Sequence, residues 1–442
     1  MGFLMEKSNF DYKFKYTGIF SLNYFIQGIN QSIFTTVIPV YLFTLGSVDL
    51  AGLSFMLSFV LVPFILKFFF GLLGDKLGTK RFGRRKPWII GSASFSGVMW
   101  IVITAVLLLT TINPATAMMI FTYMGFLVVL GVAMSDTAMD GFIIDICPKE
   151  LLGRTTGMVW AFRSLGIIVG GPMILLLLDF IHVFAIFISV GLLTIVFSMI
   201  IFTIKHPESR VSIDLKSNLK TIVKERENLK VFGFSFFMAI VDGVIFVFLA
   251  LFILIQLGFV DAVGATTSVL EEDISLYGPQ AVITFLTGIG VLGGALIGGY
   301  VADKKSRRLS LYVAVLLTAG ALLLLLIPLP SIMSWILLIF AVIVGSSSGW
   351  SNSAFSAITT QYSQQYPETP STYYSICTSF VNFGTQLGLL LTGLVFNSVA
   401  TFISDIIVIF SIVFITMIIL SSLVLIPFSL LTRSKYEIRV NS

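Results

Sequence analysis

The chain contains 442 residues, of which 57% are hydrophobic and only 11% are charged. A soluble protein of this length needs much more polar surface, so the composition excludes a soluble enzyme and indicates a protein embedded in a lipid bilayer. The net charge is +5, but the basic residues gather in short loops, so we expect membrane topology rather than nucleic-acid binding to explain it.

Twelve hydrophobic stretches follow in chain order, each long enough, at about 18 residues or more, to predict a membrane-spanning helix. They cover residues 17–45, 51–73, 87–110, 116–142, 155–178, 183–204, 231–257, 279–302, 309–328, 331–357, 372–398 and 403–428. The first stretch is too long for the core of a signal peptide and no small-residue cleavage site follows it. We therefore expect this stretch to be retained.

The basic residues predict the orientation of these spans. Of the 27 Lys and Arg residues, 25 fall in six polar segments that would face one side of the membrane. Because short basic loops stay in the cytoplasm, both termini are predicted to be cytoplasmic. The longest basic segment, 205–230, carries apolar residues among its charges and predicts an amphipathic helix at the membrane surface, with a solvated linker as the alternative. It separates an N-terminal six-helix bundle, 1–204, from a C-terminal one, 231–442.

The two halves repeat a motif. GLLGDKLGTKRFGRRKPW follows the second span and GGYVADKKSRR follows the eighth. In both, glycines that permit close helix approach precede an acid and a basic cluster that can bridge helix ends. Such repeats are typical of secondary transporters, which bind substrate between their halves. The motif predicts a cytoplasmic gate formed by Gly71, Asp75, Arg84, Arg85 and Asp303.

Five charged residues lie away from the ends of predicted spans: Lys67, Asp136, Asp140, Arg163 and Asp242. A charge near the middle of a bilayer costs at least about 2.5–3.5 kcal/mol, so each of these residues is a candidate for function. At 1.5 Å per helical residue, Lys67, Asp136 and Arg163 all lie about 12–13 Å from the cytoplasmic face. An ion pair between Asp136 and Arg163 is therefore geometrically feasible.

These charges have two interpretations. They can form a structural cluster that only holds the second, fourth and fifth spans together, or they can face the substrate cavity. We favour the second interpretation, in which Lys67 and Arg163 bind an anion and Arg163 grips a carboxylate or phosphate through two hydrogen bonds. Asp136, Asp140 and Asp242 are then the candidates for proton coupling.

Neutral polar side chains also occur inside the spans. Asn23, Gln27, Asn30 and Gln31 are spaced along one stripe of the first span. Such a stripe is sometimes only a contact between helices, but four amides favour the lining of a cavity. The predicted lining consists of Gln27, Asn30, Asn352, Asn382 and Gln386.

The loop motif, its weaker second copy and the twelve spans resemble the major facilitator superfamily over essentially the whole chain. Three segments, PFILKFFFGLLGDK, SDTAMDG and AFRSLGIIVGG, are similar to the branch that contains acetyl-CoA transporters, muropeptide permeases and folate–biopterin transporters. The resemblance implies proton-coupled or exchange transport of large polar anions, with Lys67, Asp136, Asp140 and Arg163 in the site.

Some residues depart from the pattern of that branch. Phe70-Gly71-Leu72 stands where Trp-Ala-Pro is common, and Ser135 stands where Gln is common. The FGRRKPW loop is also similar to cation-coupled glycoside and sucrose symporters, although these carry acids rather than a lysine in the second span.

The sequence thus predicts an all-α, multi-pass membrane protein that moves a polar, anionic metabolite by alternating access, coupled to protons. The alternatives are a cation-coupled sugar symporter of the same fold and a non-transporting receptor or assembly factor. We expect a monomer without enzymatic activity, cofactor or metal; Cys147 and Cys377 are isolated and no phosphate-binding loop occurs. The membrane is predicted to be the plasma membrane in a prokaryote or an organelle membrane in a eukaryote.

Overall fold

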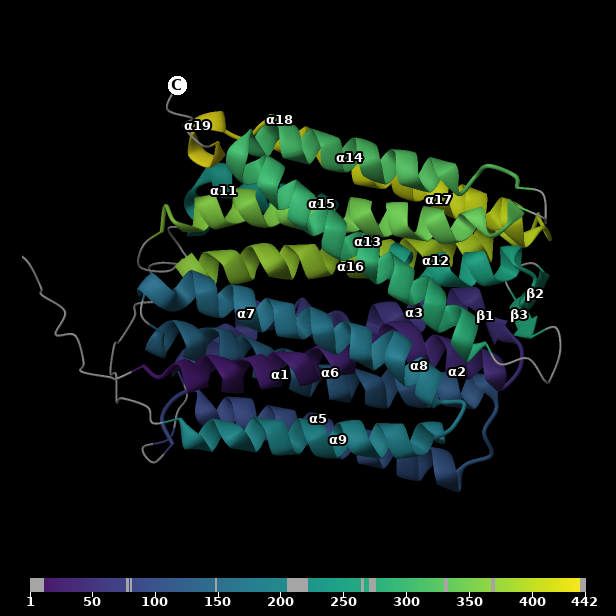
Figure 1. The fold of residues 1–442 in the computed structure, drawn as a ribbon, viewed down its shortest axis with the longest axis horizontal. Helices are drawn as coiled ribbons and strands as arrows, with labels where there is room; N and C mark the ends of the chain where they lie inside the picture. The colour runs from purple at the N-terminus through teal and green to yellow at the C-terminus, as the bar shows by residue number, and fades with distance from the viewer. Residues whose placement is uncertain are drawn as a thin grey trace, which may run out of the picture.

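The computed structural model describes residues 12–76, 79, 82–147, 149–204, 222–263, 266–269, 276–329, 333–366 and 370–437. Long helices run side by side along the longest axis of the molecule, and the described chain begins and ends at the same end of the bundle (Figure 1). This arrangement confirms the predicted helical membrane fold.

Six helical segments form the N-terminal half, and several consist of more than one helix. The elements are α1 (Phe14–Ser32), η1 (Ile33–Val37), α2 (Ile38–Thr44), β1 (Val48–Asp49), α3 (Leu50–Val60), η2 (Val62–Phe64), α4 (Lys67–Lys76), α5 (Lys86–Leu109), α6 (Pro114–Ile146), α7 (Lys149–Ile168), η3 (Val169–Met173), α8 (Ile174–Leu177), α9 (Val183–Met199) and η4 (Ile200–Thr203). Proline interrupts two of these segments, at Pro63 in η2 and at Pro172 in η3, because it lacks the N–H group of a regular helix.

The C-terminal half follows the same plan. Its elements are α11 (Arg226–Met238), α12 (Asp242–Gln256), β2 (Val260–Val263), β3 (Thr266–Val269), α13 (Tyr277–Lys304), α14 (Arg307–Leu324), α15 (Ile336–Ser363), α16 (Pro370–Val399), α17 (Ile406–Ser422), α18 (Leu425–Ser429) and α19 (Arg433–Tyr436). Most of the predicted linker, 205–221, lies outside the described residues. Its last residues, from Arg226 on, belong to α11 and thus to the seventh segment.

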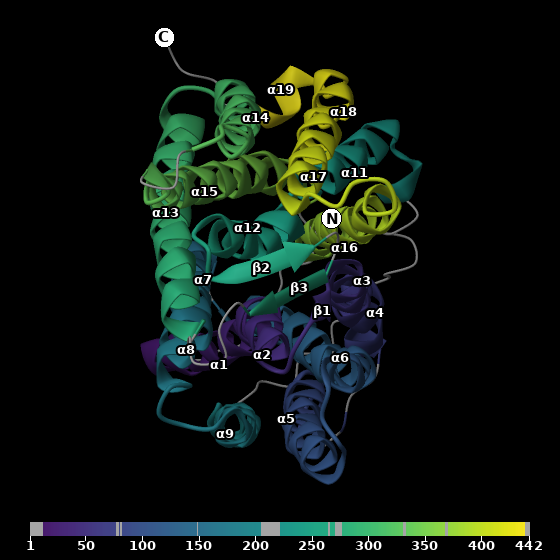
Figure 2. The same ribbon diagram turned by 90° about the vertical axis from the view of Figure 1, so that its right-hand side faces the viewer.

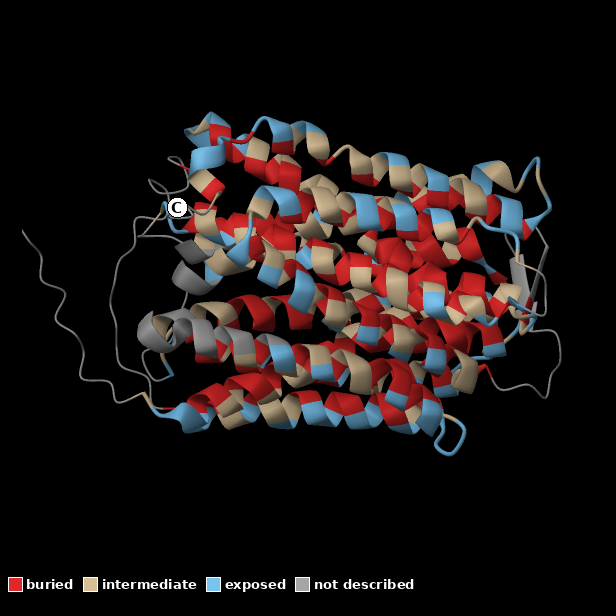
Figure 3. Cartoon of the chain, turned by 45° about the horizontal axis from the view of Figure 1, so that its top comes forward, coloured by how far each residue is buried: buried red, intermediate tan, exposed pale blue. Residues whose placement is uncertain are grey.

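Among the described segments, ten are long and apolar enough to cross a membrane. The first and fifth predicted spans are also helical. The fifth contains a shorter apolar stretch, Ala161–Leu177. Outward-facing apolar side chains such as Leu296 and Leu316 are 76% and 72% exposed, which suits contact with lipid, while buried residues fill the faces between helices (Figure 3).

Glycine pairs set two equivalent helix contacts. A side chain at Gly166 would collide with the carbonyl oxygen of Phe25, so α7 lies directly against α1. In the other half, Gly384 and Gly388 of α16 are covered in the same way by the carbonyl oxygens of Phe236 and Ile240 on α11 and its C-terminal end. Small residues one turn apart permit this approach in membranes, and the two contacts repeat between the halves.

The structure also contains a small β-sheet that the sequence analysis did not predict. Its strand order is β1-β3-β2, and both pairings are antiparallel. β1 belongs to the N-terminal half, whereas β2 and β3 lie between α12 and α13. Figure 2 shows the strands lying across the end of the molecule between the two halves. We call this end the strand end and the opposite one, where α1 and α7 begin, the basic end.

Candidate functional site

The sequence-predicted charges of the N-terminal half meet in one cluster. Asp136 of α6 accepts a hydrogen bond from Nζ of Lys67, and its Oδ2 atom lies 3.5 Å from Nη1 of Arg163. All three residues are buried, and Asp136 is only 1% exposed. The structure therefore brings together residues from α4, α6 and α7 that are far apart in the chain.

Two further residues join this cluster from α1. The Tyr24 hydroxyl donates a hydrogen bond to Oδ1 of Asp140, and Gln31 Oε1 accepts one from Nη2 of Arg163 at 3.1 Å. The sequence analysis did not assign Tyr24, because a tyrosine in a hydrophobic span carries no distinctive signal. Tyr24 and Gln31 are seven residues apart, which is two helical turns, so they lie on one face of α1.

Backbone packing fixes the position of Arg163. A side chain added at Gly28 of α1 would collide with the carbonyl oxygen of Arg163. The close contact of α1 and α7 thus starts at the residue that carries the guanidinium group, and Gln31 lies almost one turn farther along α1. The glycine contact therefore positions Arg163 between Gln31 and Asp136.

The cluster is formally neutral, with two cations and two carboxylates. Asp136 contacts both cations, whereas Asp140 accepts a hydrogen bond from the neutral hydroxyl of Tyr24. One oxygen of Asp136, Oδ1, is buried without a hydrogen-bond partner. In a medium of low dielectric constant, removing one cation from this arrangement leaves a poorly compensated charge, which is costly.

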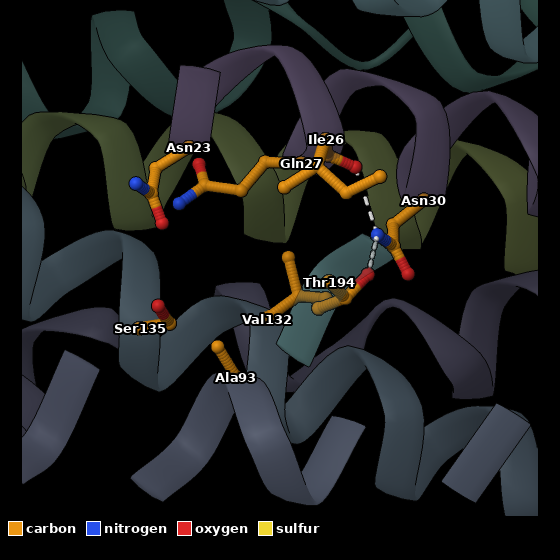
Figure 4. A pocket seen from close by; sticks show the side chains of 8 residues that line it. All are labelled: Asn23, Ile26, Gln27, Asn30, Ala93, Val132, Ser135 and Thr194. Carbon is orange, nitrogen blue, oxygen red and sulfur yellow. Dashed lines mark hydrogen bonds between the residues drawn. The ribbon is translucent and has the colours of Figure 1, made fainter. Parts of the chain in front are cut away.

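The other polar residues of the first span contact helices of the N-terminal bundle rather than the charge cluster. Asn30 donates to Ile26 O and to Thr194 Oγ1 at 2.8 and 3.0 Å, and accepts from Nε1 of Trp100 at 2.6 Å. Gln27 lies with Asn23 and Asn30 at a cavity of about 10 Å³ between α1, α5, α6 and α9 (Figure 4). This placement favours packing within the N-terminal bundle for Gln27 and Asn30.

The predicted residues of the C-terminal half lie in two places. Asp242 begins α12, and its Oδ1 atom accepts a hydrogen bond from Ser348 Oγ at 3.2 Å; Asn352, one turn along α15, donates to Ser348 O at 3.1 Å. Asn382 and Gln386 of α16 instead contact the backbone of the N-terminal half. Asp242 and Ser348 are thus paired within the C-terminal half.

The gate motif is partly described. Arg84 Nη2 and Arg85 Nε both lie close to Asp145 Oδ2, at 3.1 and 3.0 Å, so the basic loop is tied to the end of α6. A side chain at Gly71 would meet Thr137 only at an ordinary contact distance of 3.6 Å. The side chains of the other two predicted gate residues, Asp75 and Asp303, lie outside the described residues.

No group of three or more His, Cys, Asp or Glu side chains suited to a metal ion occurs among the described residues. The arrangement around Asp136 is instead suited to exchanging partners: two cations share one buried carboxylate, and an anion that enters the cluster can compete for them.

The sequence also matches a known protein family and several relatives. Residues 20–369 match the sequence profile of the Major Facilitator Superfamily. The chain is 23% identical over 303 residues to AmpG 1 of Rickettsia conorii, a protein assigned as a transporter, covering 67% of this chain and 69% of that protein. AmpG 1 of Rickettsia prowazekii is 27% identical over a shorter stretch, 30% of this chain and 29% of that protein.

Solved structures show the same fold at low sequence identity. A D-xylose–proton symporter superposes with a TM-score of 0.67 at 15% identity, covering 96% of this chain and 99% of the symporter. The nucleoside transporter NupG superposes with a TM-score of 0.66 at 12% identity, covering 94% and 99% of the two chains. These likenesses concern the fold alone.

Proposed function

This chain belongs to the major facilitator superfamily and is an integral, multi-pass membrane transporter, and from that premise we propose that it carries a polar organic anion in symport with protons. The observation that supports this proposal is the shared carboxylate of Asp136, which contacts both Lys67 and Arg163 while 1% exposed. The relatives named AmpG suggest a bacterial plasma membrane as its location.

The cluster supplies a physical link between anion and proton. An entering carboxylate or phosphate competes with Asp136 for Lys67 and Arg163, and Arg163 can bind it through two hydrogen bonds. Asp136 then remains buried without its cations, a state that costs several kcal/mol unless the group becomes neutral. Uptake of a proton by Asp136, or by the adjacent Asp140, removes that cost, so anion and proton bind together.

Amino-sugar peptides are the first substrate class to consider. Two neighbouring cations favour a substrate with carboxylate groups, and the segment AFRSLGIIVGG resembles that of muropeptide permeases. A neutral sugar has no charge with which to displace Asp136 from Lys67 and Arg163. The cation-coupled sugar symporter is therefore the second candidate.

Proton coupling is tested by uptake into proteoliposomes under separate proton and sodium gradients, with a radiolabelled muramyl peptide as the first probe. We expect Asp136→Asn and Asp140→Asn to reduce proton-driven uptake to background while counterflow exchange remains measurable. Asp405→Asn is the matched control, because Asp405 only caps the start of α17. Proton-driven uptake that is unchanged in both cluster variants contradicts the assignment.

The substrate class is tested by thermal stabilisation of the purified protein with muramyl peptides, acyl-CoAs, nucleotides, pterins and neutral sugars. A ligand present at 100 times its Kd stabilises the folded state by about 2.7 kcal/mol. We expect an anionic ligand to stabilise the wild type but neither Lys67→Ala nor Arg163→Ala. Stabilisation by neutral sugars alone would reverse the ranking of the two candidates.

A further inference from the structure

The second helical segment is interrupted immediately before Lys67. α3 ends at Val60, a short 3-10 turn covers Val62–Phe64, and α4 begins with Lys67 itself. Pro63 cannot donate a backbone hydrogen bond, so a regular helix cannot continue through this position. The interruption therefore lies directly before the cationic side chain that contacts Asp136.

The carbonyl groups at this interruption are bound by the other half of the molecule. Asn382 Nδ2 donates a hydrogen bond to Phe64 O at 3.1 Å, and Gln386 Nε2 donates one to Leu61 O at 3.2 Å. Asn382 and Gln386 are four residues apart and therefore lie on one face of α16. A buried carbonyl group without a partner is costly in a membrane. Leu61 O also accepts a backbone hydrogen bond from Phe64 N, so the amide of Asn382, which binds Phe64 O, contributes most to the interrupted conformation.

Phe64 connects this contact to the charge cluster. Its carbonyl oxygen accepts the hydrogen bond from Asn382, while its ring lies 5.6 Å from Nζ of Lys67, within the range of a cation–π contact. A cavity of about 10 Å³ beside Leu61 and Phe64 is also lined by Gln31, the partner of Arg163. Rearrangement of the interruption would thus alter the surroundings of both cations.

We propose that Asn382 and Gln386 are positioning residues that hold the interruption of the second span and thereby set Lys67 against Asp136. The C-terminal bundle then controls the charge cluster of the N-terminal bundle through the backbone of residues 61–64. When the bundles move relative to each other, the amides of α16 leave these carbonyls and Lys67 shifts. The consequence for transport rests on the proposed function; the positioning itself does not.

Another contact along the same helices provides a matched control. Ser54 Oγ donates to Leu389 O at 2.5 Å, which also joins the two halves. Ser54 lies in the regular part of α3, however, seven residues before Leu61. A residue that merely holds the bundles together should behave like Ser54, whereas a positioning residue should depend on Lys67.

The test is a double-mutant cycle on the purified full-length protein, which requires neither substrate nor gradient. We measure the midpoint of thermal unfolding for Asn382→Leu and Ser54→Ala, each alone and combined with Lys67→Met. Positioning predicts that the effect of Asn382→Leu falls by at least half in the Lys67→Met background, since coupled residues are not additive. The effect of Ser54→Ala should be the same in both backgrounds. Additive effects for Asn382→Leu overturn the proposal.

A second measurement covers the case in which Asn382→Leu does not fold. Asn382→Ser is milder, and the modification of Lys67 by an amine-reactive reagent is quantified by mass spectrometry. We expect modification of Lys67 to rise several-fold in Asn382→Ser and in Gln386→Ala, and to stay at the wild-type level in Ser54→Ala. Unchanged modification in both α16 variants overturns the proposal. Neither result depends on whether an anion or a proton is transported.

Discussion

The polar side chains of the first span divide into two groups according to the neighbour that each contacts. Asn23, Gln27 and Asn30 line the small cavity within the N-terminal bundle, whereas Tyr24 and Gln31 contact Asp140 and Arg163. Each residue turns a helix by about 100°, so a shift of one position moves a side chain to another face. Adjacent residues such as Asn30 and Gln31 can therefore differ in role, one packing within the bundle and the other contacting the site.

Replacing Asn30 distinguishes these roles. Asn30→Leu leaves Nε1 of the fully buried Trp100 without its acceptor, and an unpaired buried donor costs about 1–3 kcal/mol. We expect a lower midpoint of thermal unfolding for Asn30→Leu, with ligand-induced stabilisation unchanged. Gln31→Leu, the adjacent variant, should instead weaken ligand-induced stabilisation because Arg163 loses a partner. If Asn30→Leu abolishes the response to ligand, its side chain belongs to the site.

At the level of helices, the positions of the spans could be predicted because hydrophobic length is a local property of the sequence. The pairing of Asp136 with Arg163 followed from depth along two antiparallel helices joined by a short loop, and the structure confirms that contact. In the sequence, the only sign of the interruption before Lys67 was Pro63. The interruption between α11 and α12 contains no proline. There the hydroxyl of Thr385, 146 residues away, donates a hydrogen bond to Ala239 O.

The basic end of the C-terminal half has a network whose strength depends on pH. Glu225, just before α11, contacts Lys435 Nζ at 2.5 Å and accepts a hydrogen bond from Tyr366. These contacts, chiefly the one with Lys435, lower the pKa of Glu225 below its ordinary value of 4.5. Because the folded pKa is the lower one, the contact contributes fully above about pH 4.5 and is lost as the pH falls through the folded value.

Acidification should therefore release the segment around α19. We expect hydrogen exchange of the amides in 432–436, corrected for the intrinsic effect of pH, to be several-fold faster well below pH 4.5 than at pH 7. Glu225→Gln should produce part of this increase at pH 7, because Glu227 Oε1 separately accepts a hydrogen bond from Thr432 N. Arg433→Gln is the control, because the Arg433 side chain is 64% exposed and its ion pair with Glu437 is long, at 3.9 Å. Such an exposed pair contributes little to stability. Exchange in Glu225→Gln that equals the wild type at pH 7 argues against the assignment.

For the whole molecule, the two bundles meet along two equivalent lines of contact. α3 and α4 pack against α16, and η3 and α8 pack against α13. At the strand end, β1 of the first bundle also pairs with β3 of the second. The sequence could not reveal this pairing, because β1 has two residues and its partner lies more than 200 positions away. Local patterns do not determine a register across such a distance.

Alternating access requires that the strand end open, and the pairing of β1 with β3 must then break. Val48 and Thr267 are directly opposed in that pairing, and opposed residues in antiparallel strands have Cα atoms about 4.5–5.5 Å apart, within the range that a disulfide spans. In a variant without Cys147 and Cys377, we expect oxidised Val48→Cys/Thr267→Cys to lose at least tenfold of its uptake and to regain it with dithiothreitol.

The control cross-link lies within one bundle. Ala262 is the partner of Thr267 in the pairing of β2 with β3, so Ala262→Cys/Thr267→Cys closes a disulfide that does not join the two halves. Its uptake should remain near that of the reduced protein, because the bundles can still separate. If the cross-link between Val48 and Thr267 leaves uptake intact while mass spectrometry shows that it is complete, the strand end does not have to open during transport.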